Sequence, residues 1–386
     1  MKKTNLLLAV VLFFGIQMQQ ANAQKTSTTG ANTITTAVPF LTIAPDSRSG
    51  AMGDAGVALS PDVNSQNWNP AKYAFVTSDM GVALSYTPWL RNLVNDINLA
   101  YLVGYKRLDA NQTVSASLRY FTLGDITFMS DAGEALGNQS PNEFAIDMGY
   151  TRLLSDKFSG AVAIRYIRSD LTGGQLLNGV ETHAGSTFAT DVAFYYQNEL
   201  RNNRKVSTIA AGINLSNIGG KISYTDGTTK DFLPANMKLG VAYTTEMDAY
   251  NTITFAFDAN KLMVPTPDTA KVDILTGLGA TKSVVSGIFS SFSDAPGGLK
   301  EELKEITLSF GAEYWYNKQF ALRAGYFYED PTKGNRKFFT AGAGLKMNVF
   351  ALDFSYLLPV AQNNPLANTL RFTLSFDFDA FNKQRR

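Results

Sequence analysis

The sequence lacks cysteine altogether and contains one histidine, His183, among its 386 residues. Without cysteine there is no thiolate nucleophile and no Cys-type zinc site, and a single histidine cannot build a His-cluster metal centre. We expect neither a metal ion nor a cofactor. These absences remove many nucleophilic and metal-dependent enzyme classes from consideration.

Charge is scarce as well. Charged residues make up 17% of the chain, against the ~25% of ordinary soluble domains. The formal net charge of +1 provides no field to attract a nucleic acid. By contrast, 45% of the residues are hydrophobic and 12% are aromatic. The chain can therefore bury a large core or coat a large apolar surface, and its composition excludes disorder.

Long apolar runs are missing too, since no stretch of the chain reaches the ~18 apolar residues of a membrane-spanning helix. The run Leu6–Ile16 follows a basic start and precedes the small residues Ala21-Asn22-Ala23. This order predicts a signal peptide at residues 1–23. An uncleaved anchor helix is the alternative, but the run is too short for ~30 Å of hydrocarbon. Residues 24–36, rich in Thr, Asn, Gly and Ser, are expected to form a flexible lead-in.

From residue 80 onward, segments of about ten residues carry an apolar side chain at every second position, the period of a β-strand. In the last segment Leu370, Phe372 and Leu374 share one face, while Arg371 and Thr373 share the other. Counting such segments predicts fourteen strands, at residues 80–87, 97–107, 112–128, 143–154, 158–171, 187–198, 205–224, 236–246, 252–263, 306–316, 320–329, 337–347, 350–358 and 369–379.

An even number of strands, joined by connections that alternate between short and long, is typical of outer-membrane barrels with short periplasmic turns. We predict an all-β transmembrane barrel of 14 antiparallel strands over residues 80–381, with a long external loop at 264–305 that contains short helices. The tail 382–386 and the N-terminus are expected on the periplasmic side of a Gram-negative outer membrane. A soluble sandwich or soluble barrel is the alternative, but the second face of the strands is small and polar, as for a watery lumen.

Residues 37–79 break the alternation and are predicted to form a hatch that plugs the barrel. Glycines at three-residue spacing allow close backbone approach, and they are Gly50, Gly53 and Gly56. Charged residues that can pair in a low-dielectric space are Asp46, Arg48 and Asp54. The turn at Asn69 and Pro70 is well placed to begin a short helix.

Two segments carry a resemblance to a known family. The run APDSRSGAMGDAGVALSPD followed by NWNPAKYA, and the later run SSFSDAPGGLKEELKE, resemble the PorV (LptO) branch of the FadL-like long-chain fatty-acid transporter barrels. The resemblance covers essentially the whole mature chain. It implies an N-terminal hatch and a role in type IX secretion beside a giant translocon barrel. It also implies that cargo proteins are bound by their C-terminal signal domains and passed to the surface attachment complex.

Charges of both signs are predicted on the lumen face. We expect them to form ion pairs that fill the lumen and pin the hatch, because selective pores usually favour one sign. The lumen candidates for pairing are Arg119, Arg165, Glu313, Arg323 and Arg371. Candidates for partner or cargo binding lie in predicted external connections and are Trp89, Leu90, Val285, Ile288, Phe289, Phe292 and Asp294. Alternatively, the long loop packs as a lid on the barrel mouth, and the tryptophan lies at the lipid interface.

The favoured function is non-catalytic: the plugged barrel presents external loops to a secretion signal domain and docks its wall, among outer-membrane lipids, against the translocon. The alternative is FadL-like uptake of a hydrophobic small molecule, which requires a continuous apolar pocket between the hatch and the external loops. A third possibility is deacylation of lipid A, which would require His183 to activate a hydroxyl such as Thr182 or Ser186.

Overall fold

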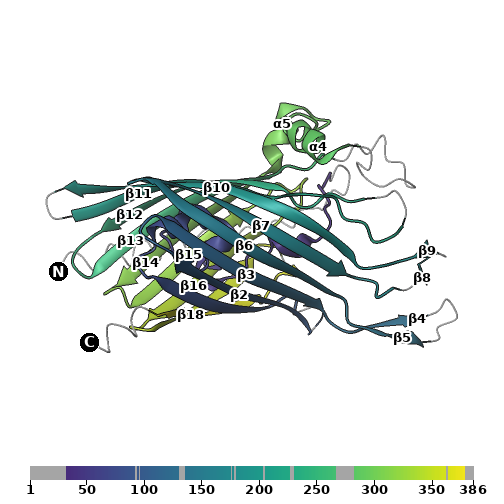
Figure 1. The fold of residues 1–386 in the computed structure, drawn as a ribbon, viewed down its shortest axis with the longest axis horizontal. Helices are drawn as coiled ribbons and strands as arrows, with labels where there is room; N and C mark the ends of the chain where they lie inside the picture. The colour runs from purple at the N-terminus through teal and green to yellow at the C-terminus, as the bar shows by residue number, and fades with distance from the viewer. Residues whose placement is uncertain are drawn as a thin grey trace. The chain divides into compact units, whose positions relative to one another are not determined.

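The structure, a computed structural model, describes residues 32–91, 94, 96–129, 135–174, 176–177, 180–202, 205–226, 230–266, 282–361 and 364–378. The expected signal peptide and C-terminal tail lie outside these residues. Among the described residues, fourteen strands close into an antiparallel barrel in which each strand pairs with the next and β1 pairs with β18 (Figure 1). The predicted fold class is confirmed.

The barrel strands follow one another around the ring in chain order. They are β1 (Met80–Pro88), β2 (Ile97–Arg107), β3 (Gln112–Leu123), β6 (Asn142–Ser155), β7 (Phe158–Asp170), β10 (Gly185–Asn202), β11 (Lys205–Gly219), β12 (Asn236–Glu246), β13 (Asn251–Leu262), β14 (Ile306–Tyr316), β15 (Phe320–Tyr328), β16 (Lys337–Lys346), β17 (Phe350–Pro359) and β18 (Leu370–Asp377).

Two further ribbons lie outside the ring. Residues 112–128 were expected to form one strand, but β3 ends at Leu123, before Gly124, whose φ is +81°. Beyond this break β4 (Ile126–Met129) pairs with β5 (Ala135–Gln139), and β8 (Leu176–Leu177) pairs with β9 (Val180–Glu181). Both ribbons belong to connections at the right-hand end in Figure 1, here called the long-connection end. The opposite, short-turn end carries the tight hairpins.

Successive side chains alternate between the two faces of the wall. On β1, Leu84 and Tyr86 are 52% and 46% exposed, whereas Ala83 and Ser85 are buried. The apolar face therefore points to lipid and the small, polar face to the lumen, as the period-2 pattern predicts. Closure of the ring pairs the backbone donors and acceptors that a free sheet edge would leave unsatisfied in hydrocarbon.

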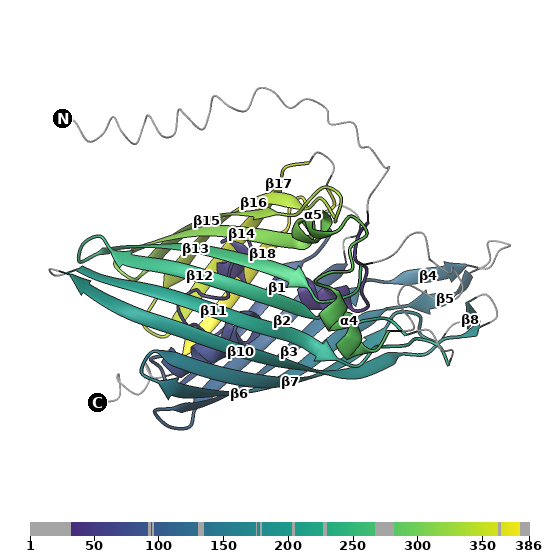
Figure 2. The same cartoon turned by 90° about the horizontal axis from the view of Figure 1, so that it is seen from above.

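The hatch consists of short helical turns inside the ring, drawn in purple in Figure 2. These are η1 (Pro39–Thr42), α2 (Ser47–Gly50), α3 (Ser65–Trp68) and η2 (Pro70–Phe75). The connection between β13 and β14 carries α4 (Val284–Ser290), α5 (Leu299–Glu302) and η3 (Leu303–Glu305). Among the helices described, none is long and apolar enough to cross a bilayer.

The hatch lies directly on glycine-lined parts of the inner wall. A Cβ added to Gly311 would lie 2.7 Å from the Cβ and the carbonyl oxygen of Met52 in the hatch. Other wall glycines in contact with the hatch backbone or its Cβ atoms are Gly212, Gly240, Gly325 and Gly342. Since real Cβ atoms do not tolerate such distances, the missing side chains are what allow the hatch to fit.

We expect Gly311→Val to displace the hatch, because the added atoms overlap the backbone of Met52. The measurement is ion conductance of the purified protein in planar bilayers, which should rise well above that of the unaltered barrel. Ala312→Val is the matched control, since Ala312 is the next residue on β14 and faces lipid; its conductance should stay unchanged. Equal conductance of both variants would contradict the proposed fit.

Candidate functional site

Arg48 ties the hatch to the barrel wall. Its Nε and Nη2 donate to the two oxygens of Glu313 on β14, at 3.0 and 2.8 Å. Arg323 on β15 donates to the same carboxylate at 2.7 Å and to Asp353 at 2.6 Å. Arg48 also bonds Asp62 of the hatch at 3.0 Å. The result is a buried chain of alternating charges from the hatch into the wall, in which each cation has a carboxylate partner.

A second link joins Asp54 to Arg371 on β18. The Arg371 Nη2 lies 3.7 Å from the Asp54 carboxylate, and the Arg371 Nε donates to the carbonyl oxygen of Ala44. Gly50 leaves room for this guanidinium, because a Cβ there would lie 2.9 Å from its side-chain atoms. The predicted lumen residue Arg371 is thus in contact with three parts of the hatch.

The expected pairing of Asp46 with lumen charges is wrong. Asp46 caps α2 by accepting from the Ser49 N–H at 2.9 Å, and it accepts from the indole N–H of Trp68 at 2.5 Å. Both partners belong to the hatch. The first N–H groups of a helical turn have no acceptor within the helix, and an Asp that precedes the turn can accept from them. This local preference explains why Asp46 bonds Ser49. Asp46 therefore holds the hatch together internally.

The remaining predicted hatch residues shape its backbone. Gly53 has a φ of +69°, and a Cβ there would collide with the Tyr326 backbone. A Cβ at Gly56 would collide with the Trp68 ring. Asn69 caps η2 and donates to carbonyl oxygens of the hatch and of β10, while the carbonyl oxygen of Pro70 accepts from Thr151 at 2.8 Å.

Arg119 and Arg165 differ in what they reach. Arg119 on β3 donates to the carbonyl oxygen of Leu41 in the hatch at 2.9 Å. Arg165 on β7 bonds Asp147 at 2.5 Å and Asp191 at 3.0 Å, both on neighbouring barrel strands. Arg119 therefore contributes to holding the hatch, whereas the ion pairs of Arg165 reinforce the wall alone.

The long-connection end of the lumen is filled by apolar side chains. Phe40 of the hatch stacks on Phe121, with ring centroids 6.2 Å apart, inside a buried cluster. Trp89 and Leu90, predicted to bind a partner, pack against this cluster and are half-buried. These two residues take part in closing the lumen. On the other side of the hatch, a cavity of about 590 Å³ lies at the short-turn end, and its lining includes Asp62, Glu313 and Arg323.

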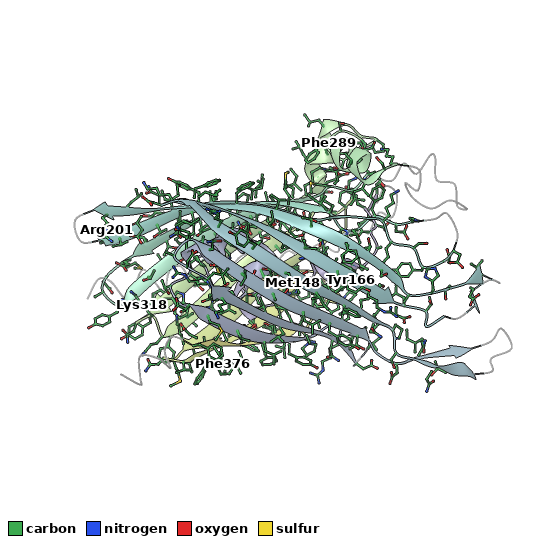
Figure 3. All side chains as sticks on the ribbon, viewed as in Figure 1. Met148, Tyr166, Arg201, Phe289, Lys318 and Phe376 are labelled. Atoms are coloured by element: carbon green, nitrogen blue, oxygen red, sulfur yellow. The ribbon has the colours of Figure 1, made fainter. Side chains whose placement is uncertain are left out.

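The helices of the β13–β14 connection expose apolar side chains. Phe289, labelled in Figure 3 on the outside of the wall, is 74% exposed. We call the following residues the external apolar surface: Val285, Phe289, Phe292, Leu299 and Leu303, which are 43–75% exposed. Ile288 is half-buried. Asp294 instead stabilises the loop, since it accepts from the Thr266 N–H at 3.2 Å and from Lys282 at 3.3 Å.

A cluster that the sequence analysis missed holds α5 and η3 to the barrel. Lys261 at the end of β13 bonds Glu302 at 2.9 Å and Glu305 at 2.6 Å. Lys333, in the β15–β16 connection, bonds Glu305 at 2.9 Å and Glu301 at 2.6 Å. Lys333 also keeps the pKa of the Glu301 carboxyl below its ordinary value of 4.5 through its hydrogen bond. The charged run LKEELKE at residues 299–305 was the only sign of this cluster in the sequence.

His183, the residue that lipid A deacylation would require, lies in an exposed pair with Asp226. Its ring Nε2 is 3.4 Å from the Asp226 carboxylate, and its Nδ1 faces the carbonyl oxygen of Ala184 at 3.2 Å. Side chains of both residues in the pair are exposed. Among the residues that the structure describes, these contacts of the ring are with a carboxylate and a carbonyl oxygen, whereas deacylation would need a hydroxyl nucleophile beside the ring.

The ring of lipid-facing strands and the buried hatch define the class: an integral outer-membrane β-barrel with an N-terminal plug. The family model described as type IX secretion system protein PorV matches residues 25–269, which is more than half of the chain. The chain therefore belongs to the PorV family, as its resemblance in the N-terminal segment implied.

The chain is similar to several solved structures, and the two with TM-scores of 0.50 and 0.52 show the same fold. The toluene transporter TodX of P. putida is 10% identical with a TM-score of 0.50, over 86% of this chain and 97% of that one. A TodX mutant described as a monoaromatic hydrocarbon channel is 13% identical with a TM-score of 0.52, and the match covers 86% of this chain and 98% of that one. A FadL homologue of Pseudomonas aeruginosa is 10% identical, with a TM-score of 0.42, over 87% and 99%. A search of curated proteins finds no match.

Arg48→Ala should loosen the hatch, because it leaves the buried Glu313 carboxylate without one of its two arginines. Removing one partner of a buried ion pair costs about 3–5 kcal/mol. We expect higher conductance in planar bilayers. The control is Arg165→Ala, which removes a lumen cation whose carboxylate partners both lie on barrel strands, and it should leave the plug closed. Unchanged conductance of Arg48→Ala would refute the role of this pair.

Acid should release α5 from the barrel. Because the pKa of Glu301 is lowered in the folded protein, the stabilisation from its ionised form is complete above pH 4.5 and is lost as the pH falls through the lowered pKa. Hydrogen-exchange protection of the α5 amides, corrected for intrinsic rates, should fall on acidification. Glu301→Gln should reduce the protection at neutral pH and flatten its pH dependence; a dependence as steep as in the unaltered protein would count against the effect.

Proposed function

We propose that this PorV-family barrel acts in type IX secretion as a non-catalytic binding protein of the outer membrane. Its external loops bind the C-terminal signal domain of cargo proteins, its wall docks against the giant translocon barrel, and cargo passes from it to the surface attachment complex. The observation that carries the proposal is the contrast between a closed lumen and an exposed apolar surface on the β13–β14 connection.

The closed lumen favours protein binding over transport. A FadL-like transporter needs an apolar path between the hatch and the external loops. Here that end of the lumen holds the cluster around Phe40 and Phe121, and the cavity on the other side of the hatch includes charged side chains in its lining. Both observations support a plug that stays in place while binding occurs outside.

The external apolar surface supports a protein partner. Exposed aromatic residues such as Phe289 and Phe292 lose water when a partner covers them, and such residues dominate the binding free energy of interfaces. The cluster around Lys261 and Lys333 fixes α5 and η3 to the barrel, so that this part of the surface loses less conformational freedom on binding.

We expect Phe289→Ser combined with Val285→Ser to weaken partner binding by about 30-fold, the equivalent of roughly 2 kcal/mol for an aromatic anchor. The measurement is a mild-detergent pull-down of the tagged full-length protein from native outer membranes, followed by mass spectrometry. A giant barrel and cargo with a shared C-terminal domain should be recovered with the unaltered protein and depleted with the variant.

The matched control is Val360→Ser, because Val360 is 55% exposed in the β17–β18 connection and lies outside the proposed surface. It should recover the same partners as the unaltered protein. Equal recovery with the double variant would contradict binding at α4. Recovery of a lone barrel with a bound apolar molecule would support the transporter alternative.

A further inference from the structure

The first described residues lie at the long-connection end of the barrel. The N–H of Asn32 donates to the carbonyl oxygen of Thr332 at 2.9 Å, and its side-chain amide donates to Glu301 at 3.2 Å. The N–H of Ala37 donates to the carbonyl oxygen of Phe232 at 2.9 Å. These three acceptors belong to three different long connections. The segment Asn32–Thr36, here called the strap, is therefore held among the loops of that end.

The other end of the hatch lies at the short-turn end. The N–H of Arg107, at the end of β2, donates to the carbonyl oxygen of Asp79 at 2.7 Å, and its guanidinium donates to that of Val76 at 3.2 Å. Met80 then begins β1. The hatch thus runs the length of the lumen, with its N-terminal side at the long connections and its C-terminal side at the short turns.

We infer that the strap lies on the cell-surface side of the outer membrane. In barrels of this class the long connections are external and the short turns periplasmic, so the contacts of Asn32 place the strap outside. The buried side chains of Phe40 and Leu41 separate it from the lumen. Thr33 and Thr35 are exposed. The sequence analysis expected the N-terminus on the periplasmic side, whereas the strap is inferred to lie on the opposite side of the membrane.

The strap forms part of the external face that carries α5. Asn32 and Lys333 both bond the Glu301 carboxylate, and Lys333 continues to Glu305 on the same loop. A protein partner that covers this carboxylate also contacts the strap, which leads directly into the hatch through Ala37. The external surface and the plug are therefore joined by one short stretch of chain.

Thiol labelling of intact cells tests the inference, and the absence of cysteine from the chain makes each variant carry a single thiol. Thr33→Cys and Thr35→Cys are treated with a membrane-impermeant maleimide in cells that produce the full chain. Ser293→Cys, exposed beside α4, marks the external side, and Asp109→Cys, in the β2–β3 turn, marks the periplasmic side. Heat-modifiable migration on gels confirms that each variant folds.

We expect both strap variants to be labelled in intact cells as fully as Ser293→Cys, and Asp109→Cys to be labelled only after permeabilisation. Labelling of the strap variants only after permeabilisation would overturn the inference, and so would the reverse pattern for the two markers. Because labelling requires neither cargo nor translocon, its outcome is independent of the proposed secretion role.

Discussion

Closure of the backbone hydrogen-bond ring is the constraint on which the rest of this structure depends. A strand in hydrocarbon has no water to bond, so every N–H and C=O must find a neighbouring strand. The pairing of β1 with β18 supplies the last of these neighbours. Once the ring is closed, its circumference and the alternation of side chains are fixed, and the lumen must be filled by something that fits a polar wall.

The hatch fills this space by two complementary means. Where the wall is bare glycine, backbone packs on backbone, and where the wall carries charge, Arg48 and Asp54 of the hatch pair with Glu313 and Arg371. Both kinds of contact are needed. Without the ion pairs, the buried charges of the wall would be left without partners, which is costly. Packing of backbone on glycine alone would not fix the position of the hatch along the wall. The balanced signs of the charges follow from this structural task, which differs from the task of selecting ions.

The sequence was sufficient to predict the number of barrel strands and most of their positions, since a period of two is a local property that residues such as Leu370 to Phe376 display without reference to the rest of the chain. It did not show where β3 and β11 end, at Leu123 and Gly219. Contacts across the lumen are a different matter. Arg48 and Glu313 are 265 positions apart, and their meeting depends on the register of strands between them. The anchoring of α5 by Lys261 and Lys333 and the direction of the hatch share this dependence on tertiary structure. The capping role of Asp46 is local, since its partner Ser49 lies three residues further along the chain.

The position of the hatch before β1 in the chain has a consequence for assembly. The glycine-lined wall on which it rests comes from β11 to β16, which are made long after it, and the last pairing, between Ser85 and Thr373, joins positions 288 apart. Contacts so distant in sequence form slowly. Until they form, the hatch has neither its packing surface nor its carboxylate partners. Seating of the plug and closing of the seam also share β18, since Thr373 bonds Ser85 across the seam and Ser47 in the hatch. Whatever keeps β1 apart from β18 therefore also keeps the barrel unsealed.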